Sequence, residues 1–177
     1  MPFTPFHFGI VLAGFLFRKL HIVALAVSAV IMDLEPAYYM FISPRPDGIL
    51  HGFFHTYLGA TFLALVVGFF FLKTKNIWNP ILKELHLLPE SPIRVSNDST
   101  ASISFGWIFA SSFLGAYSHI FFDSFMHADL LPFWPLSDAN PFLGQFDLEL
   151  LHLLLVFGLV LSGVLWVRRL VRFESEK

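Results

Sequence analysis

The chain has 177 residues, of which 56% are hydrophobic, 18% aromatic and only 14% charged. Soluble domains carry about 25% charged residues, and a chain of this size has too little interior to bury 23 phenylalanines. With a mean hydropathy of +0.70, the composition excludes disorder, argues against a soluble globular domain and predicts a membrane protein. The lack of cysteine excludes disulfides and thiolate-bound zinc, and the net charge of −2 gives no footprint for nucleic acid.

Five apolar segments predict an all-α membrane bundle of about five transmembrane helices, in one domain that covers 1–177. The segments span approximately 3–17, 20–32, 52–72, 103–126 and 148–167. A full crossing needs about 20 residues, so the last three are long enough and the first two are short. We expect the first two to cross with local thinning of the bilayer, the alternative being a shallow hairpin.

The basic residues predict the orientation of the chain. If all five segments cross, ten of the eleven Lys and Arg residues share one side and only Arg45 lies on the other. The positive-inside rule then predicts an extracytoplasmic N-terminus and a cytoplasmic C-terminus. The ten residues are Arg18, Lys19, Lys73, Lys75, Lys83, Arg94, Arg168, Arg169, Arg172 and Lys177.

Two connecting segments have a character of their own. In the cytoplasmic loop 73–102, Asn79-Pro80 resembles an N-cap followed by a first helical residue, and predicts a short amphipathic helix. This helix either lies on the membrane surface or packs against the bundle. The outer loop 128–147 is rich in proline and aromatic residues and lacks Lys and Arg, which suits an interfacial loop or a lid.

Most of the ionisable residues fall on the outer side of this topology. Six of the eight histidines and several carboxylates lie there. They are His7, Asp33, Glu35, His51, His55, His119, Asp123, His127, Asp147, Glu149 and His152. His21 and His86 fall on the other side, where we expect ordinary packing.

The spacing of these residues predicts a metal site. His51-x3-His55 would place two imidazoles on one helix face, and His119-x3-Asp123-x3-His127 would place three ligand-type side chains on one stripe. His119 would then lie about 12 Å below His127. An ionised Asp123 at such depth needs a partner, and no Lys or Arg on the outer helix halves supplies one. A divalent cation fits this need, the alternatives being a proton relay or a buried polar network.

Four motifs follow one another between residue 1 and about residue 145. They are Met1-Pro-Phe-Thr-Pro-Phe-His7, Asp33-Leu-Glu35-Pro36, His51-Gly-Phe-Phe-His55-Thr56 and Ser118-His119-x3-Asp123-Ser-x2-His127. Together they resemble the predicted membrane-bound metal-dependent hydrolases, which include the LexA-binding, inner-membrane-associated hydrolases. The resemblance implies an integral protein of a prokaryotic inner (plasma) membrane that hydrolyses its substrate with a divalent metal.

A more distant likeness is to zinc-dependent phospholipase C, an all-helical enzyme with three zinc ions. Its order of ligands is similar to His7, Asp33, His51 or His55, and His119 with Asp123, and by that likeness Asp123 would bridge two ions. The third zinc site departs from the pattern, because only His127 and Glu149-x2-His152 are available for it. We therefore expect one or two ions, with zinc favoured.

These observations lead to one main hypothesis, a membrane-embedded metal-dependent hydrolase of a lipid or lipid-linked phosphoester. An ion would lower the pKa of a bound water and polarise the scissile bond. The expected ligands are His7, Asp33, His51, His55, His119, Asp123 and His127. Glu35 is expected as general base or as a partner behind a ligand, with Asp33 and His127 as further catalytic residues. Arg45, Trp134, Glu149 and His152 are weaker candidates for substrate binding.

Two alternatives stay open at this point. A metal or proton transporter, or a metal-sensing membrane module, would also place His and Asp within the membrane. Against transport, the inner helix halves 61–72 and 158–167 offer only Thr61 and Ser162 besides glycine. The other alternative is a structural partner that retains an inactive site.

Overall fold

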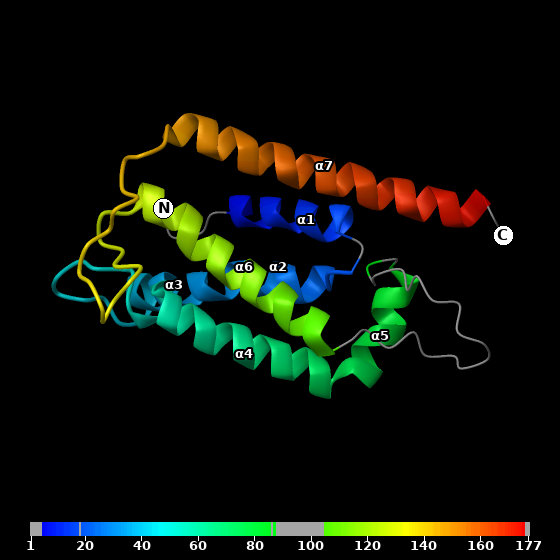
Figure 1. The fold of residues 1–177 in the computed structure, drawn as a ribbon, viewed down its shortest axis with the longest axis horizontal. Coiled ribbons are helices and arrows are strands. Elements are labelled where there is room, and N and C mark those ends of the chain that lie inside the picture. The colour runs from blue at the N-terminus through cyan, green and yellow to red at the C-terminus, as the bar shows by residue number, and fades with distance from the viewer. Residues whose placement is uncertain (1–4, 18, 86, 88–104, 176–177) are drawn as a thin grey trace.

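The computed structural model describes residues 5–17, 19–85, 87 and 105–175, which form helices and loops without a strand (Figure 1). The prediction of an all-α bundle is thus confirmed. Several features expected from the sequence lie outside the described residues: Arg18, His86, Arg94 and Lys177, and residues 1–4, 88–104 and 176–177.

Helices α1, α2, α4, α6 and α7 run alternately in opposite directions along the bundle (Figure 1). In order they are η1 (Pro5–Ile10), α1 (Val11–Leu16), α2 (Ile22–Val30), η2 (Ile31–Asp33), α3 (Leu34–Phe41), η3 (Phe53–His55), α4 (Tyr57–Lys73), α5 (Lys75–Glu84), α6 (Phe105–Met126) and α7 (Leu148–Ser175). Three stretches are long and apolar enough to cross a membrane, Ile22–Phe41, Phe105–Met126 and Leu148–Arg172. A fourth is added if α4 and α5, bent by 83°, count as one span.

The first predicted segment is shorter than a full span. It forms the apolar helix His7–Leu16, whose first part is the 3-10 helix η1. At about 1.5–2.0 Å per residue, ten residues cover roughly half of a hydrocarbon core about 30 Å thick. Of the five segments expected, this one therefore does not have the length of a membrane-spanning helix.

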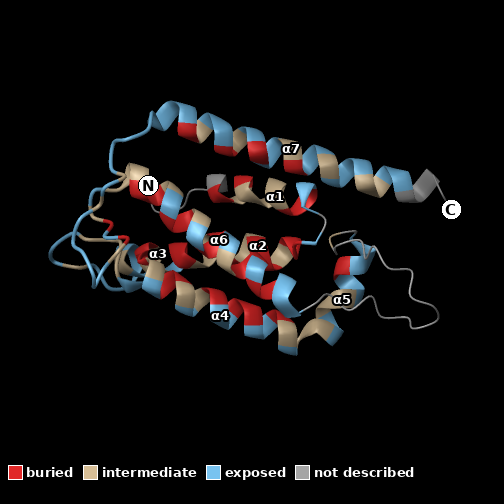
Figure 2. Cartoon of the chain, in the orientation of Figure 1, coloured by how far each residue is buried: buried red, intermediate tan, exposed pale blue. Residues whose placement is uncertain are grey.

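The helices pack around α2 and α6, whose residues are the most buried (Figure 2). α2 and α4 both pack on α6, whereas α7 lies along one edge, against η1 and α1 (Figure 1). The bundle has two ends. We call the one that holds α3 and the segments 42–56 and 127–147 the loop end, and the opposite one the α5 end.

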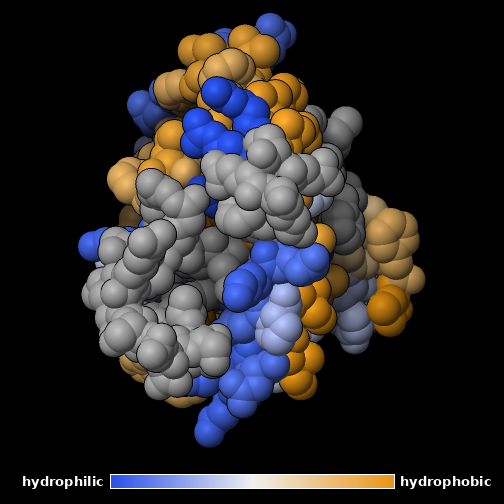
Figure 3. Space-filling view, turned by 90° about the vertical axis from the view of Figure 1, so that its right-hand side faces the viewer, coloured by the Kyte–Doolittle hydropathy of each residue, from blue (hydrophilic) through white to orange (hydrophobic). Residues whose placement is uncertain are grey.

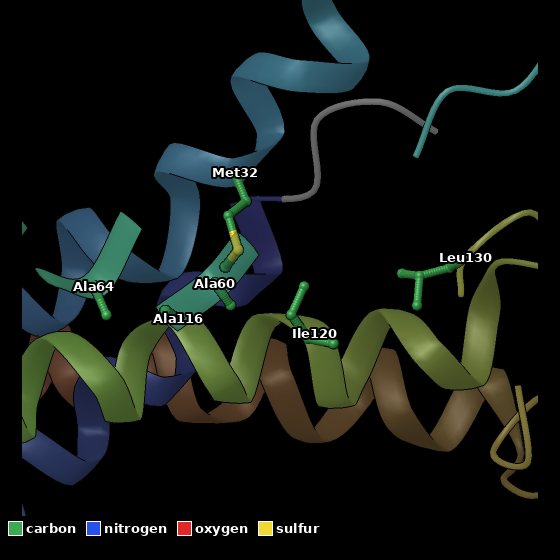
Figure 4. Packing of buried hydrophobic residues seen from close by; sticks show 6 residues of the cluster. All are labelled: Met32, Ala60, Ala64, Ala116, Ile120 and Leu130. Carbon is green, nitrogen blue, oxygen red and sulfur yellow. The ribbon is translucent and has the colours of Figure 1, made fainter. Parts of the chain in front are cut away.

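Small apolar residues let α4 and α6 pack closely near the loop end (Figure 4). The cluster there consists of Met32, Ala60, Ala64, Ala116, Ile120 and Leu130, all 0% exposed. Leu130 belongs to the segment after α6 and packs beside Ile120, so this loop is anchored in the core. Where helices pack within lipid, small residues allow the backbones to approach and gain dispersion contacts.

The second apolar helix continues past the point where the sequence predicts its end. The acidic residues and proline of Asp33-Leu-Glu35-Pro36 indicated a stop near Met32, but the chain passes through η2 into α3. Pro36 is the third residue of α3. The N–H groups in the first turn of a helix have no acceptor within that helix, so a proline there removes no helical hydrogen bond. Asp33 and Glu35 therefore lie within a helical element instead of a loop.

Three further boundaries differ from the prediction. α4 begins at Tyr57 rather than near residue 52, because the Thr56 hydroxyl caps it by accepting from the Gly59 N–H. α5 begins at Lys75 rather than after Asn79, so Pro80 lies inside it; the turn that starts it is formed at Thr74, whose carbonyl accepts from Ile77 and Trp78.

α7 also runs beyond the predicted end at 167, to Ser175. Charged side chains do not end a helix, and no Gly or Pro follows Gly163 in it.

The α5 end carries the Lys and Arg residues that the structure describes, except Arg45. Figure 3 looks at this end, where hydrophilic residues gather in the middle and hydrophobic residues lie on the flanks. The basic residues are Lys19, Lys73, Lys75, Lys83, Arg168, Arg169 and Arg172. Among the described residues of the loop end only Arg45 is basic, and it pairs with Asp47 at 3.1 Å.

Candidate metal centre

Helix α6 supplies two buried ligand-type side chains, His119 and Asp123, one turn apart and 0% and 2% exposed. Gly115, one turn earlier, lets α6 approach α2, since a Cβ there would overlap the carbonyl oxygen of Leu25. The approach brings His119 Nδ1 within 2.7 Å of the Ala29 carbonyl oxygen, to which it donates. Nε2 of the neutral imidazole then keeps its lone pair and lies 3.2 Å from Asp123 Oδ2.

Asp33 enters the site at the break in the second apolar helix. α2 ends at Val30, and Asp33 is the last residue of the 3-10 turn η2. Short 3-10 stretches between helical turns often mark functional positions. Asp33 is 4% exposed, and its Oδ1 lies 3.7 Å from His119 Nε2. Two different helices therefore direct carboxylates at one imidazole.

His7 is brought to the same place by the packing of η1 against α7. A Cβ at Gly9 would overlap the carbonyl oxygen of Leu155, and a Cβ at Gly158 would lie 2.8 Å from the carbonyl oxygen of Gly9. Only glycine allows this approach. His7 is 1% exposed, and its Nε2 lies 2.9 Å from Asp123 Oδ1. Besides this contact, neither atom has a hydrogen-bond partner in the described part of the chain, and His7 Nδ1 has none there.

We call His7, Asp33, His119 and Asp123 the inner group. Each offers one potential ligand atom, and these atoms lie within 4.8 Å of one another. The two oxygens of Asp123 face different partners, Oδ1 toward His7 and Oδ2 toward His119. Carboxylate and imidazole are the ligand types of zinc and related divalent ions, so the inner group could hold a metal ion.

His55 extends the inner group toward the loop end. Its Nε2 lies 3.3 Å from His119 Nε2 and 4.0 Å from Asp123 Oδ2. Burial lowers the pKa of His55 to about 4, although the neighbouring Glu35 acts in the opposite direction. At neutral pH the imidazole is uncharged, as a metal ligand must be.

Glu35 fixes the orientation of His55. Its Oε2 accepts from His55 Nδ1 at 2.9 Å and from the Gly52 N–H at 3.1 Å, while Oε1 accepts from the Phe54 N–H at 3.3 Å. Gly52 is needed here, because a Cβ at this position would overlap Glu35 Oε1. A carboxylate behind the distal nitrogen of a ligating histidine is a common feature of metal sites. Of the two roles predicted for Glu35, these contacts favour the partner behind a ligand.

A second carboxylate, Asp129, holds His51 in the same manner. Its Oδ1 lies 2.9 Å from His51 Nδ1, and its Oδ2 accepts from the Leu50 and His51 N–H groups at 3.0 and 3.2 Å. Burial tends to raise the pKa of Asp129, but these donors outweigh it and lower the pKa to about 2. The ring of His51 packs on that of His127, with centroids 4.3 Å apart. We call His51, His127 and Asp129 the outer group; their potential ligand atoms also lie within 4.8 Å of one another.

Five imidazoles form a continuous row from the inner to the outer group. The ring centroids are 4.1 Å apart for His7 and His119, 5.2 Å for His119 and His55, 4.7 Å for His55 and His51, and 4.3 Å for His51 and His127. His51 and His55 also form a third candidate ligand set with Asp123. The structure thus brings together all seven residues that the sequence nominates as ligands.

Helix spacing was expected to bring His51 beside His55 and to align His127 with His119 and Asp123, and the structure differs in both cases. His51 and His55 do not share a helix face, because His51 lies in an irregular segment before η3 and His55 is the last residue of η3. The carboxylates behind them bring the two rings together instead. His127 lies just after the last residue of α6, Met126, and belongs to the outer group, so the stripe of three is divided between two groups.

The weaker candidates lie at the rim. Arg45 pairs with Asp47 and covers the ring of Tyr39, 5.1 Å from its centroid, and neither group of ligand-type residues includes it. Trp134 is 43% exposed and meets the edge of Phe53, with ring centroids 6.4 Å apart. Both side chains are thus at the loop end, outside the metal-ligand groups.

The first turns of α7 carry the remaining two candidates. Glu149 is exposed. His152 donates from Nδ1 to the Leu148 carbonyl oxygen at 2.7 Å, and its ring is near enough to His7 for the two to interact electrostatically. His152 therefore lies near His7 of the inner group, whereas Glu149 belongs to none of the three candidate ligand sets.

Sequence reasoning missed two participants. Asp129 follows His127 by two residues, and this His-x-Asp spacing at a helix end was the available indication. The Ala29 carbonyl oxygen, which fixes His119, leaves no trace in residue type. Ala29 is positioned by the contact of α2 with Gly115, a tertiary relationship.

One protein-family model matches almost the entire chain. The model of a domain of unknown function, DUF4184, matches residues 1–176. The chain belongs to the DUF4184 family. Neither the curated proteins nor the solved structures contain a match. The DUF4184 description names no activity. The inner and outer groups are therefore the features of the chain that bear on its chemistry.

Proposed function

We propose that the protein is a membrane-embedded metal-dependent hydrolase that acts on a lipid or lipid-linked phosphoester. One observation carries the proposal: Nε2 of His7 and Oδ1 of Asp123 approach to 2.9 Å in the buried inner group, and neither atom has another hydrogen-bond partner among the described residues. A buried carboxylate without a permanent positive charge beside it costs several kcal/mol in an apolar environment. No Lys or Arg among the described residues reaches it, and a divalent cation is the partner that suits both atoms.

The donor set fits zinc or a similar ion, and one or two ions are expected. Asp33, His55, His119 and Asp123 are the core ligands, with His7 opposite the second oxygen of Asp123. A bound divalent ion supplies Lewis-acid polarisation of the scissile bond and activation of water. Glu35 positions His55, and the further catalytic candidates are Asp33, to accept a proton, and His127, to donate one to a leaving group.

A lipid substrate suits the surroundings of the site. Phe53, Leu131 and Trp134, at the rim of the loop end, are 42%, 36% and 43% exposed. Aromatic and apolar side chains at the end of a membrane bundle suit the level of the lipid headgroups. The basic residues at the α5 end support a cytoplasmic position for that end and an extracytoplasmic position for the site, in a prokaryotic inner membrane.

The proposal is tested with detergent-purified full-length protein. Metal content is measured for the wild type, Asp123→Ala and His55→Ala, and hydrolysis of a fluorescent phospholipid is followed with and without chelator. We expect stoichiometric divalent metal and chelator-sensitive hydrolysis in the wild type, and a loss of both in the two variants. Glu84→Gln, an exposed carboxylate change at the α5 end, serves as control. Bound metal without hydrolysis, together with ion flux in sealed vesicles, would establish a transporter instead.

A further inference from the structure

We propose that the outer group, His51, His127 and Asp129, is a separate capture site for a divalent cation, from which the inner group is loaded. The inference rests on the proposed function in one respect, namely that the inner group holds an ion. It adds a second site with its own ligands and its own role.

The outer group has the chemistry of a cation site. Asp129 accepts three N–H bonds, and a carboxylate offers about four lone-pair positions, so one position is left for an ion. Nδ1 of His51 faces Asp129, which leaves Nε2 as the nitrogen available to a metal. His127 adds a second imidazole, in ring contact with the first. Two imidazoles and one carboxylate are a ligand set suited to zinc and similar ions.

The outer group differs from the inner group in its access to solvent. The side chain of Asp129 is 31% exposed, while the side chains of the inner group are at most 6% exposed; that of His51, at 7%, lies close to the inner-group range. Three ligands at a partly exposed position leave room for water around an ion. A weaker and more rapidly exchanging site is therefore expected here than in the inner group.

The three candidate ligand sets share members in a way that connects the two groups. His51 belongs to the outer group and to the set His51, His55 and Asp123, and Asp123 belongs to that set and to the inner group. An ion can therefore pass inward by exchanging ligands one after another, without leaving imidazole and carboxylate donors. The alternative, direct entry of a hydrated cation between apolar helices, carries the cost of removing its water in an apolar medium.

The test uses purified full-length protein that has been stripped of metal with a chelator, and zinc alone as the probe. Zinc binding is titrated at equilibrium, and the rate of loading is followed by competition with a fluorescent zinc indicator. His127→Ala and Asp129→Asn are the variants. The Asn side chain keeps an acceptor for the Leu50 and His51 N–H groups, and His127→Ala leaves the bonds of Asp129 to these two N–H groups in place. Asp138→Asn, an exposed carboxylate in the same loop, is the matched control.

The wild type and Asp138→Asn should show one tight and one weaker zinc site. Both variants should lose the weaker site, keep the tight one, and load it slower by about tenfold or more. The capture site is wrong if the variants load at the wild-type rate, if they lose both sites together, or if the wild type has the tight site alone. A wild type that binds no zinc at all would instead refute the proposed function itself.

Discussion

Nε2 of His7 and Oδ1 of Asp123 lie 2.9 Å apart in the buried inner group, and neither atom has a further hydrogen-bond partner within the described part of the chain. Buried polar groups in folded proteins are satisfied almost without exception. His7 comes from η1 and Asp123 from α6, so the packing of separate elements brings the two atoms together. Such an arrangement is expected when both atoms share a further partner.

The first prediction concerns removal of that partner. A ligand that binds only the folded state stabilises it by about 2.7 kcal/mol at 100 times its dissociation constant. The thermal midpoint of the detergent-solubilised protein should therefore fall by several degrees in excess chelator and recover on addition of zinc. His7→Phe, which fills a similar volume without a ligand atom, should reduce this metal-dependent shift. Identical midpoints with and without chelator in the wild type would argue against a bound ion.

The second prediction concerns Glu35. Replacement by Gln keeps an acceptor for one backbone N–H but presents an amide where His55 Nδ1 needs a carboxylate. Changes behind a ligating histidine cost about 10–100-fold in metal affinity. Glu35→Gln should weaken zinc binding by this factor in an indicator competition, whereas Glu84→Gln should not. A general base without a positioning role would show the opposite pattern, unchanged affinity with lost hydrolysis.

The third prediction concerns the approach of α6 to α2 at Gly115. A methyl group there would overlap the Leu25 carbonyl oxygen and press on the Ala29 N–H, 3.0 Å away. Gly115→Ala should destabilise the protein by about 1–3 kcal/mol and weaken zinc binding, because His119 loses its register with Ala29. Gly163→Ala in α7 is the control, since a Cβ there meets nothing within 4 Å. Equal thermal midpoints and zinc affinities for the two variants would contradict this account of the packing.

The fourth prediction concerns pH and His21, which lies 2% exposed just before α2. Its Nδ1 accepts from the Ala24 N–H as an N-cap, and burial lowers its pKa from 6.5 to about 4. The unfolded imidazole therefore takes up a proton at a higher pH than the folded one. The free energy of unfolding is therefore highest above about pH 6.5 and decreases as the pH falls toward 4. At pH 5 the decrease due to His21 is about 2 kcal/mol.

His21→Asn tests this pH dependence, because Asn caps a helix without titrating. Thermal midpoints in detergent are compared between pH 7.5 and 5. The wild type should lose more stability over this range than His21→Asn, and parallel curves for the two proteins would refute the role of His21.

The sequence predicts the number of apolar segments, because these depend on hydropathy. It also predicts that the ligand-type residues converge at one end, because this depends on the direction in which each segment runs. α6 ends within a residue of the predicted position, since Asp123 and His127 mark the approach to the loop end. Prediction was wrong at Pro36 and Pro80, where residue type alone does not tell whether a proline stands in the first turn of a helix or further along it. It was also wrong about the His51 and His55 helix face, because carboxylates that are distant in sequence position those rings.

The most direct test of the metal centre is X-ray absorption at the metal edge of the purified, metal-loaded wild type. The account predicts one or two bound ions, zinc being favoured, with nitrogen and oxygen ligands at about 2.0–2.1 Å and the multiple scattering of imidazole. Asp123→Asn should lose bound metal in the same preparation. Protein that retains no divalent ion after loading, or an ion with a shell that contains no imidazole, would contradict it.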